Sequence, residues 1–137
     1  MPLFYADASA LVKLVVAEPE TAALRAYIDG AELVSSELVL TEIPLAINRA
    51  AATDRALPRE RMLILASELL DAIGLLAVDR TLLITSGTLA EPCLRALDAI
   101  HVAAAISVGS LDAFVTYDER QGAAARLLGL RTMVPAG

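Results

Sequence analysis

The sequence predicts an α/β fold around a mostly parallel sheet, because short apolar runs alternate with longer helical patterns along the chain. A chain of 137 residues is most simply one domain, which we expect to span residues 1–137. The apolar fraction of 57% exceeds the usual range of roughly 45–50%. This composition supplies a large core and predicts apolar surface for a partner or a second copy.

The expected strands are short apolar runs bounded by polar or turn-forming residues, and they span 3–6, 32–35, 75–78, 113–117 and 130–134. The expected helices span 10–16, 19–29, 37–52, 58–73, 81–90, a segment with Asp98 near its start, and 119–128. Gly30 and Gly129 follow two of these helices, as glycine often does at a helix C-terminus. Pro44 removes one backbone hydrogen bond inside the third helix and predicts a kink near residues 40–42.

Composition also argues against several classes of protein. No apolar run approaches the roughly 18 residues of a membrane span, because charged and polar residues interrupt each run. The first residues lack a basic stretch and contain Asp7, so they do not resemble a signal peptide. A single cysteine, Cys93, excludes an intrachain disulfide and fits a reducing compartment. We therefore expect a cytoplasmic protein without a membrane partner.

The formal net charge of −6 argues against a broad basic surface for nucleic acid. It does not exclude an enzyme whose acids gather at a metal ion, because a divalent cation inverts the local electrostatics. Arginines elsewhere would then be available to contact phosphate. Arg55, Arg59 and Arg61 cluster around the start of the helix expected at 58–73, where they are either ordinary solvated charge or a patch that faces RNA or a partner.

Four acids stand out by position. Asp7 and Asp118 follow expected strands, whereas Glu42 and Asp98 lie on the apolar sides of expected helices. A carboxylate near a core is costly unless something pairs with it, and functional groups of open α/β sheets gather beyond the carboxyl ends of the strands. The alternatives are plain: Asp7 as a helix N-cap, and Glu42 as a solvated acid that pairs with an arginine such as Arg49.

Clustered carboxylates repel one another unless they are protonated or bridged by a cation. Oxygen ligands suit Mg²⁺ or Mn²⁺, whereas the chain lacks the thiolate cluster or paired histidines that would indicate zinc. A divalent ion would lower the pKa of a bound water and stabilise displacement at a phosphodiester. Asp79 also follows an expected strand, and its simplest role is to cap the next helix.

Several segments resemble PIN-domain proteins. Residues 4–14, FYADASALVKL, resemble the opening of that family. Residues 97–105, LDAIHVAAA, resemble its third acidic motif. Residues 115–120, VTYDER, resemble the fourth motif, and residues 124–130, AARLLGL, resemble the helix that follows it. Glu42, within LTEI, matches the second acid. The resemblance covers essentially the whole chain, whose length and single-domain form are similar to the VapC toxins of toxin–antitoxin pairs.

The resemblance implies a three-layer α/β/α sandwich and a Mg²⁺- or Mn²⁺-dependent endoribonuclease. It implies that Asp7 and Asp98 bind metal most directly. Glu42 and Asp118 would complete the acidic pocket and hold the metal or its waters. All four acids are therefore expected to be catalytic, and three of them, Asp7, Asp98 and Asp118, to be metal ligands.

The resemblance also implies supporting residues and partners. Ser9 and Thr116 would lie close by and hydrogen-bond a carboxylate or a metal-bound water. The partners are an RNA substrate and a VapB-type antitoxin that lays an apolar segment, often with a basic side chain, into a groove of the toxin. A homodimer or a toxin–antitoxin hetero-oligomer would account for the apolar surplus. Pro44, just after Glu42, departs from what the pattern explains.

Other interpretations stay open. His101 is either a histidine that hydrogen-bonds within the fold or a general base one turn after Asp98, and Lys13 contacts phosphate or extends along the surface. A catalytically silent RNA- or protein-binding module is one alternative. A receiver-like phospho-acceptor domain is another, although the first motif offers one acid where that domain needs a pair. An aspartyl phosphatase would need an acid two residues after Asp7, where Ser9 stands.

Overall fold

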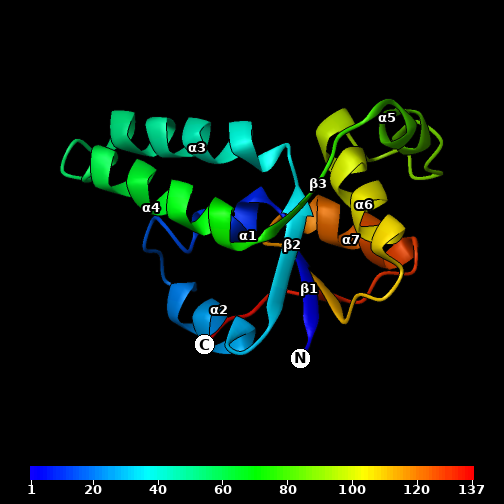
Figure 1. Ribbon diagram of the computed structural model, residues 1–137, viewed down its shortest axis with the longest axis horizontal. Coiled ribbons are helices and arrows are strands. Elements are labelled where there is room, and N and C mark those ends of the chain that lie inside the picture. The colour runs from blue at the N-terminus through cyan, green and yellow to red at the C-terminus, as the bar shows by residue number, and fades with distance from the viewer.

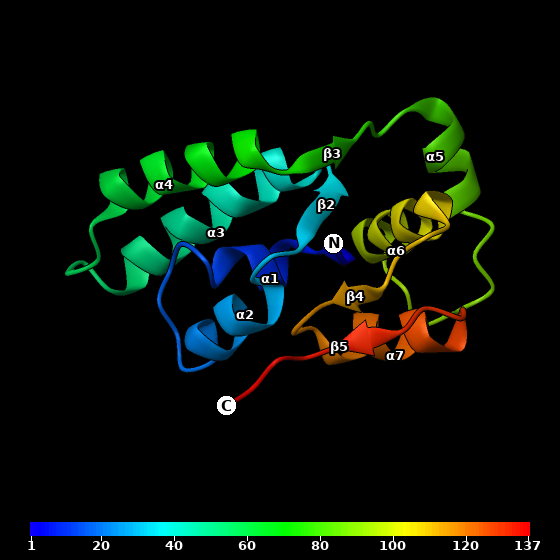
Figure 2. The same ribbon diagram turned by 60° about the horizontal axis from the view of Figure 1, so that its bottom comes forward.

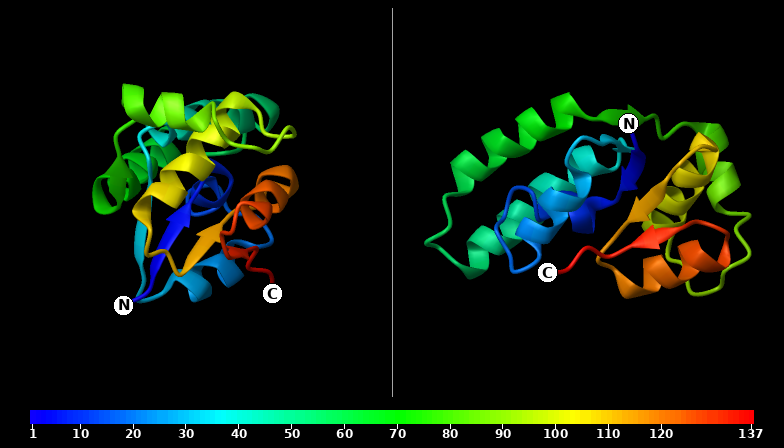
Figure 3. Two further views of the ribbon diagram at one scale, coloured as in Figure 1. Left: turned by 90° about the vertical axis from the view of Figure 1, so that its right-hand side faces the viewer. Right: turned by 90° about the horizontal axis from the view of Figure 1, so that it is seen from below.

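A computed structural model describes all 137 residues, and its strands form one sheet in which every pairing is parallel. The strand order is β3-β2-β1-β4-β5. The strands are β1 (Leu3–Ala6), β2 (Glu32–Ser36), β3 (Gly74–Leu76), β4 (Ala113–Val115) and β5 (Thr132–Met133). The expected parallel sheet is confirmed, and β1, the first strand of the chain, lies at its centre between β2 and β4 (Figure 3).

Seven helices complete the fold, and they are α1 (Ala8–Val12), α2 (Thr21–Ile28), α3 (Val39–Thr53), α4 (Arg59–Ala72), α5 (Arg80–Ser86), α6 (Ala96–Val108) and α7 (Glu119–Leu127). Helices α1 to α4 cover one face of the sheet, and α5 to α7 cover the other (Figure 1). The three-layer α/β/α sandwich is therefore confirmed. None of these helices combines the length and apolarity needed to traverse a bilayer.

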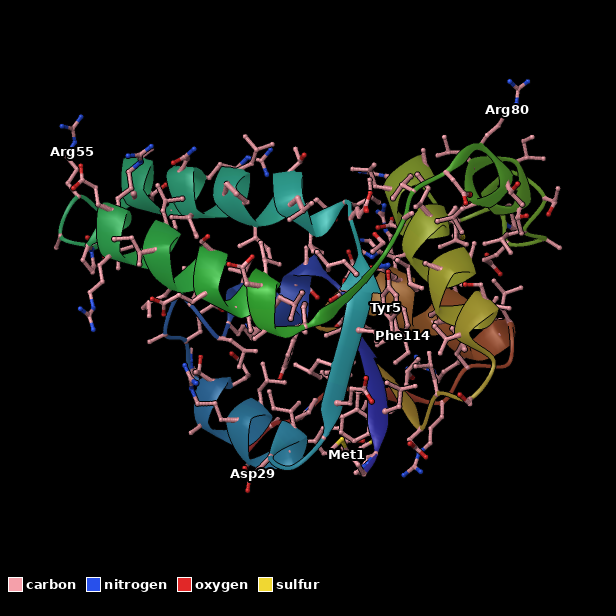
Figure 4. All side chains as sticks on the ribbon, viewed as in Figure 1. Met1, Tyr5, Asp29, Arg55, Arg80 and Phe114 are labelled. Carbon is pink, nitrogen blue, oxygen red and sulfur yellow. The ribbon has the colours of Figure 1, made fainter.

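Alternate residues of β1 supply the two halves of the core, as strand geometry requires. Phe4 packs among the side chains of α1 to α4, and its ring stacks on Tyr27 at a centroid distance of 4.8 Å. Tyr5 points to the opposite layer, where its ring stacks on Phe114 of β4 at 5.3 Å (Figure 4). This alternation directs the Tyr5 hydroxyl toward α6.

Two helices end four residues earlier than the sequence pattern predicts. Helix α1 ends at Val12 instead of residue 16, because the next three N–H groups bond to carbonyls three residues back, in tighter turns. Helix α5 ends at Ser86 instead of residue 90. There the hydroxyls of Ser86 and Thr88 donate to the carbonyls of Leu82 and Thr85, which competes with continuation of the helix.

The ends of three strands and the course of the helix at Pro44 also bear on the expectations from the sequence. Strands β3, β4 and β5 are each shorter than expected, and β3 begins at Gly74 instead of residue 75. Helix α3 continues through Pro44, which has no N–H to donate to the carbonyl of Leu40. Leu40 is 50% exposed, so water can satisfy that carbonyl. The kink predicted there stays a prediction.

Candidate functional site

The carboxyl ends of β1 and β4 meet although the two strands are distant in the sequence. Ala6 pairs with Val115, and the N–H of Asp7 donates to the carbonyl of Val115 at 3.3 Å. The chain winds outward from β1 through β2 and β3, then returns to the other side of β1 for β4 and β5. Open α/β sheets bind ligands at such a reversal. Asp7 directly follows β1, and Asp118 begins the helix after β4.

Asp7 is almost fully buried, with 2% of its surface exposed. One carboxylate oxygen accepts hydrogen bonds from the Ser9 hydroxyl at 2.6 Å and the Ala10 N–H at 3.0 Å, and the other accepts from the Thr116 hydroxyl at 2.5 Å. Asp7 is thus also the N-cap of α1, as the plain alternative predicted. Burial raises the pKa of Asp7 despite the lowering effect of these bonds. A nearby cation would stabilise the ionised form.

The hydroxyls of Ser9 and Thr116 tie Asp7 to the loop between β4 and α7. Ser9 Oγ accepts the N–H of Tyr117 at 2.9 Å and lies 3.3 Å from Thr116 Oγ1. Thr116 is fully buried, and its Oγ1 accepts the N–H of Asp118 at 3.0 Å. Each hydroxyl therefore accepts from this loop while it donates to Asp7. The expected hydrogen bonds from Ser9 and Thr116 to a carboxylate are present.

Asp98 and Asp118 lie at the starts of two helices. Asp98 lies half-buried in the first turn of α6, whereas Asp118 is exposed and caps α7 by accepting the N–H of Gln121 at 3.0 Å. Loss of hydration raises the pKa of Asp98, and the negative charge of Asp118 raises it further. These two carboxylates are therefore close enough to repel each other.

Glu42 is held by a buried histidine instead of an arginine. Its Oε1 lies 2.6 Å from Nε2 of His101, and Nδ1 of His101 lies 2.7 Å from the hydroxyl of Tyr5. His101 is 2% exposed and Tyr5 is fully buried. The predicted alternative in which Glu42 pairs with Arg49 is wrong, because the ion pairs of the structure join Glu42 only to His101. The interpretation of His101 as a residue that hydrogen-bonds within the fold is confirmed.

The chemistry of this chain of contacts sets the tautomer of the imidazole. Burial raises the pKa of Tyr5 above its ordinary value, so the phenol keeps its proton and can donate it to Nδ1. A carboxylate only accepts, so the proton between His101 and Glu42 is on Nε2. Glu42 is thereby fixed in orientation by a residue of the sheet acting through a residue of α6. We call Tyr5, His101 and Glu42 the imidazole link.

Sequence reasoning missed the part played by Tyr5. The residue reads as one more apolar position of a buried strand, and its partner is 96 residues away. The available signal was the coincidence of a tyrosine and a histidine in two stretches that should both be buried. Buried phenol and imidazole groups need hydrogen-bond partners, so each was a reason to look for the other.

The four acids converge on one edge of the sheet without forming a tight cluster. No three acidic, histidine or cysteine side chains lie close enough to share one ion. His101 lies one helical turn after Asp98 on α6, and its Nε2 contacts Glu42, so it connects these two acids. The donors are carboxylate oxygens, which suit a hard divalent cation. Mg²⁺ typically keeps several waters and needs only one or two carboxylates, so the residues present fit such an ion.

An open groove of about 480 Å³ adjoins Ser9 and Glu42 between α1 and α3. Leu45 and Leu97 on its wall are 45% and 50% exposed, and Arg49 also lines it. The groove thus combines exposed apolar side chains with one carboxylate of the imidazole link.

Lys13, at the rim of this groove, has partners that the sequence did not predict. Its Nζ pairs with Glu18 at 2.5 Å and Glu20 at 3.1 Å, and lies 4.7 Å from the ring centre of Tyr117. Only 9% of the residue is exposed. Two carboxylates therefore engage Nζ of Lys13, and the alternatives of a contact with phosphate or a lysine extended along the surface stay predictions.

Comparison with known proteins finds similarity over almost the entire chain. A family model described as PIN domain matches residues 4–127. Ribonuclease VapC46 of Mycobacterium tuberculosis is 38% identical over 138 residues, which cover 99% of this chain and 100% of the relative. Ribonuclease VapC47 of the same species is 34% identical over 139 residues, which cover 97% of each chain.

Two solved structures have a similar fold. The crystal structure of PAE2754 from Pyrobaculum aerophilum gives a TM-score of 0.68 at 20% identity and covers 96% of this chain and 83% of that one. The crystal structure of VapBC2 from Rickettsia felis, bound to a DNA fragment from their promoter, gives a TM-score of 0.67 at 12% identity. It covers 96% of this chain and 97% of that one. At these identities the likeness is one of fold.

The raised pKa of Asp7 predicts a pH-dependent gain in stability for Asp7→Asn. A raised pKa in the folded state means that stability falls as pH rises from the unfolded-state value, about 3.9, through the folded-state value. Without metal at pH 7, we expect the asparagine variant to melt about 3–5 °C higher than the parent. This shift corresponds to a gain of roughly 1 kcal/mol in the free energy of unfolding for a chain of this size. Calorimetry in chelator should show this difference shrinking as pH falls toward about 4. Asp71→Asn, at an exposed position of α4, is the control and should change the melting temperature little.

The imidazole link predicts that Tyr5→Phe destabilises the fold. The substitution keeps the ring that stacks on Phe114 and removes only the hydroxyl, so that Nδ1 of buried His101 loses its donor. We expect a loss of about 1–3 kcal/mol in the free energy of unfolding, measured by urea denaturation. Tyr27→Phe, on the other face, is the matched control, because its ring packs on Phe4 and its hydroxyl makes no hydrogen bond within the chain. Equal losses in the two variants would contradict the role given to the Tyr5 hydroxyl.

Proposed function

This chain belongs to the PIN-domain family, and we propose that it is a Mg²⁺- or Mn²⁺-dependent endoribonuclease that acts as the toxin of a VapB–VapC-type pair. The observation that carries the proposal is the arrival of Asp7, Glu42, Asp98 and Asp118 at one reversal point of the sheet. The names of the relatives support RNA as the substrate.

In the proposed site, Asp7, Asp98 and Asp118 hold the metal directly or through its waters. The ion would supply an activated water and stabilise the charge that develops on the phosphate. Asp7 is held in place by Ser9 and Thr116, so its oxygens need little reorganisation. The mutual repulsion of Asp98 and Asp118 favours binding of a cation between or near them.

Glu42 has a different role in this proposal. Because Nε2 of His101 fixes one carboxylate oxygen, the second oxygen is left to accept a hydrogen bond from the water that attacks the phosphodiester. His101 acts through Glu42 and is a positioning residue. Tyr5 in turn maintains the tautomer that can donate to Glu42.

The exposed groove beside Glu42 supports a VapB-type antitoxin as the partner. Leu45 and Leu97 would receive an apolar segment, and Glu42 would receive a basic side chain. The surplus of exposed apolar residues also supports a homodimer or a toxin–antitoxin hetero-oligomer. We further propose that the whole chain acts as one domain and that the protein is cytoplasmic. These proposals are consistent with the single sheet and the exposed unpaired Cys93.

One observation favours a second candidate function. Because no three carboxylates share one ion site, a catalytically silent PIN-like module that binds RNA or protein competes with the nuclease. The receiver-like phospho-acceptor domain is no longer an alternative, since the chain belongs to the PIN-domain family. Cleavage of RNA separates the two candidates that remain.

We expect Asp98→Asn to lower the rate of RNA cleavage by roughly 100-fold or more, because it removes a charge that faces the metal. The measurement is cleavage of total RNA by purified protein with Mg²⁺, with Mn²⁺ and with chelator. Asp79→Asn is the matched control, because this acid caps α5 and asparagine also caps helices. Equal cleavage by the parent and Asp98→Asn would contradict the site, whereas a parent inactive with either metal would favour the silent module.

We expect Leu45→Glu and Leu97→Glu each to weaken binding of the antitoxin encoded by a neighbouring gene by about 10-fold, because each places a charge where an apolar segment should pack. Isothermal titration calorimetry measures the affinity. Ile84→Glu is the control on α5, where the parent side chain is 62% exposed and lies outside the groove. Loss of binding by the control alone would place the antitoxin elsewhere.

A further inference from the structure

We propose that the outer end of the α3–α4 hairpin binds the phosphate backbone of the RNA substrate at a distance from the bond that is cleaved. The surface consists of Asn48, Arg49, Arg55 and Arg59, which we call the hairpin patch. This inference rests on the proposed ribonuclease function and names the part of the surface that holds the substrate.

The hairpin patch is a basic region of an acidic protein. Residues 48–61 contain four of the 11 basic residues and only two of the 17 acidic residues. The rest of the chain is therefore more acidic than the net charge of −6 suggests, and it repels a polyanion. A protein of this charge needs a local basic surface to retain RNA. The hairpin projects away from the sheet, with the α3–α4 connection at its far end (Figures 1 and 2).

The arginines of the patch are available to a ligand. All the ion pairs of the structure involve Lys13 or His101, so no acid neutralises Arg49, Arg55 or Arg59. All three arginines are exposed. Arg55 extends outward at the hairpin tip, at the opposite end of the molecule from Arg80 (Figure 4).

The patch also has a shape that suits a chain of phosphates. Asn48, Arg55 and Arg59 line an open hollow of about 420 Å³. Nε of Arg59 donates to the Asn48 side-chain oxygen at 2.9 Å, which orients the guanidinium and leaves its other N–H groups free. A guanidinium can donate two parallel hydrogen bonds to one phosphate. The patch can therefore recognise the backbone without reading the bases.

Helix α3 connects the patch to the proposed catalytic edge. Arg49 lines the groove that contains Glu42, and Ala52, one turn further along the helix, lines the hollow of the patch. The rise from Glu42 to Ala52 is roughly 15 Å. An RNA strand that lies along α3 can therefore contact the patch while a phosphodiester lies at the acids.

The lining of the hollow favours RNA over a protein segment. Its apolar residues are Ala51, Ala52 and Leu57, which offer no deep pocket for a large side chain. The groove with exposed leucines lies at the other end of α3, beside Glu42. The hollow would thus serve the substrate backbone and the groove the antitoxin, with Arg49 shared by the groove and the hairpin patch.

The test measures RNA binding without cleavage, using the full chain with Asp98→Asn as background in every sample. Fluorescence anisotropy follows a short labelled single-stranded RNA between roughly 50 and 200 mM salt. We expect Arg55→Gln with Arg59→Gln to weaken binding about 10-fold at the lower salt. The slope of the logarithm of the binding constant against the logarithm of the salt concentration should fall in magnitude by about 1.4, or ~0.7 for each phosphate that an arginine no longer neutralises. Arg59→Lys alone removes the guanidinium and keeps the charge, so it should retain most of the slope.

The matched control is Arg80→Gln with Arg131→Gln, which removes the same charge from exposed positions outside the patch and should leave the slope unchanged. Equal weakening by both pairs would overturn the inference, as would no change with the patch variant. Normal RNA binding with loss of antitoxin binding would also overturn it, because the patch would then contact protein. Cleavage assays in the parent background test the ribonuclease proposal separately, so failure of the hairpin patch and failure of that proposal give different results.

Discussion

The buried carboxylate of Asp7 is the constraint on which the rest of the site depends. A buried carboxylate is stable only with hydrogen-bond donors around it. Here the donors come from the segments that follow both β1 and β4. Ser9 and the Ala10 N–H belong to α1, whereas Thr116 belongs to the loop after β4. The start of α1, the pairing of two strands and the position of Asp118 are therefore fixed together. A change in one of these elements would disturb the hydrogen bonds of the others.

The imidazole link fixes Glu42 as the hydroxyls of Ser9 and Thr116 fix Asp7. Tyr5 and Asp7 lie two residues apart, and from this short stretch one residue reaches α6 through His101 and the other caps α1. Glu42 on α3 is thereby connected to β1, the central strand that Asp7 directly follows. Hydrogen bonds fix Asp7 and Glu42, whereas Asp98 and Asp118 stay partly hydrated. This arrangement leaves part of the acidic edge accessible to solvent.

Much of the fold follows from local pattern. Apolar runs identify the strands because β1 and β4 are buried and the other strands are partly buried, and Asp7, Asp79 and Asp118 stand at helix starts where a side-chain oxygen can cap. The partners of Glu42 and Lys13 did not follow. His101 is 59 residues from Glu42, and no local periodicity relates them. Helix ends were also missed, because competing hydroxyls and tighter turns depend on particular hydrogen bonds and not on average apolarity.

The separation of Asp7 from its donor Thr116 has a consequence for biosynthesis. The two residues are 109 positions apart, and the strand that carries Thr116 into place pairs with the first strand of the chain. During synthesis, the segment that carries Asp7 is made 109 residues before Thr116 and before the strand that positions this hydroxyl. Fragments that stop before β4 therefore lack the hydrogen bonds that order Asp7, and the acidic edge is assembled only after Thr116 has been made.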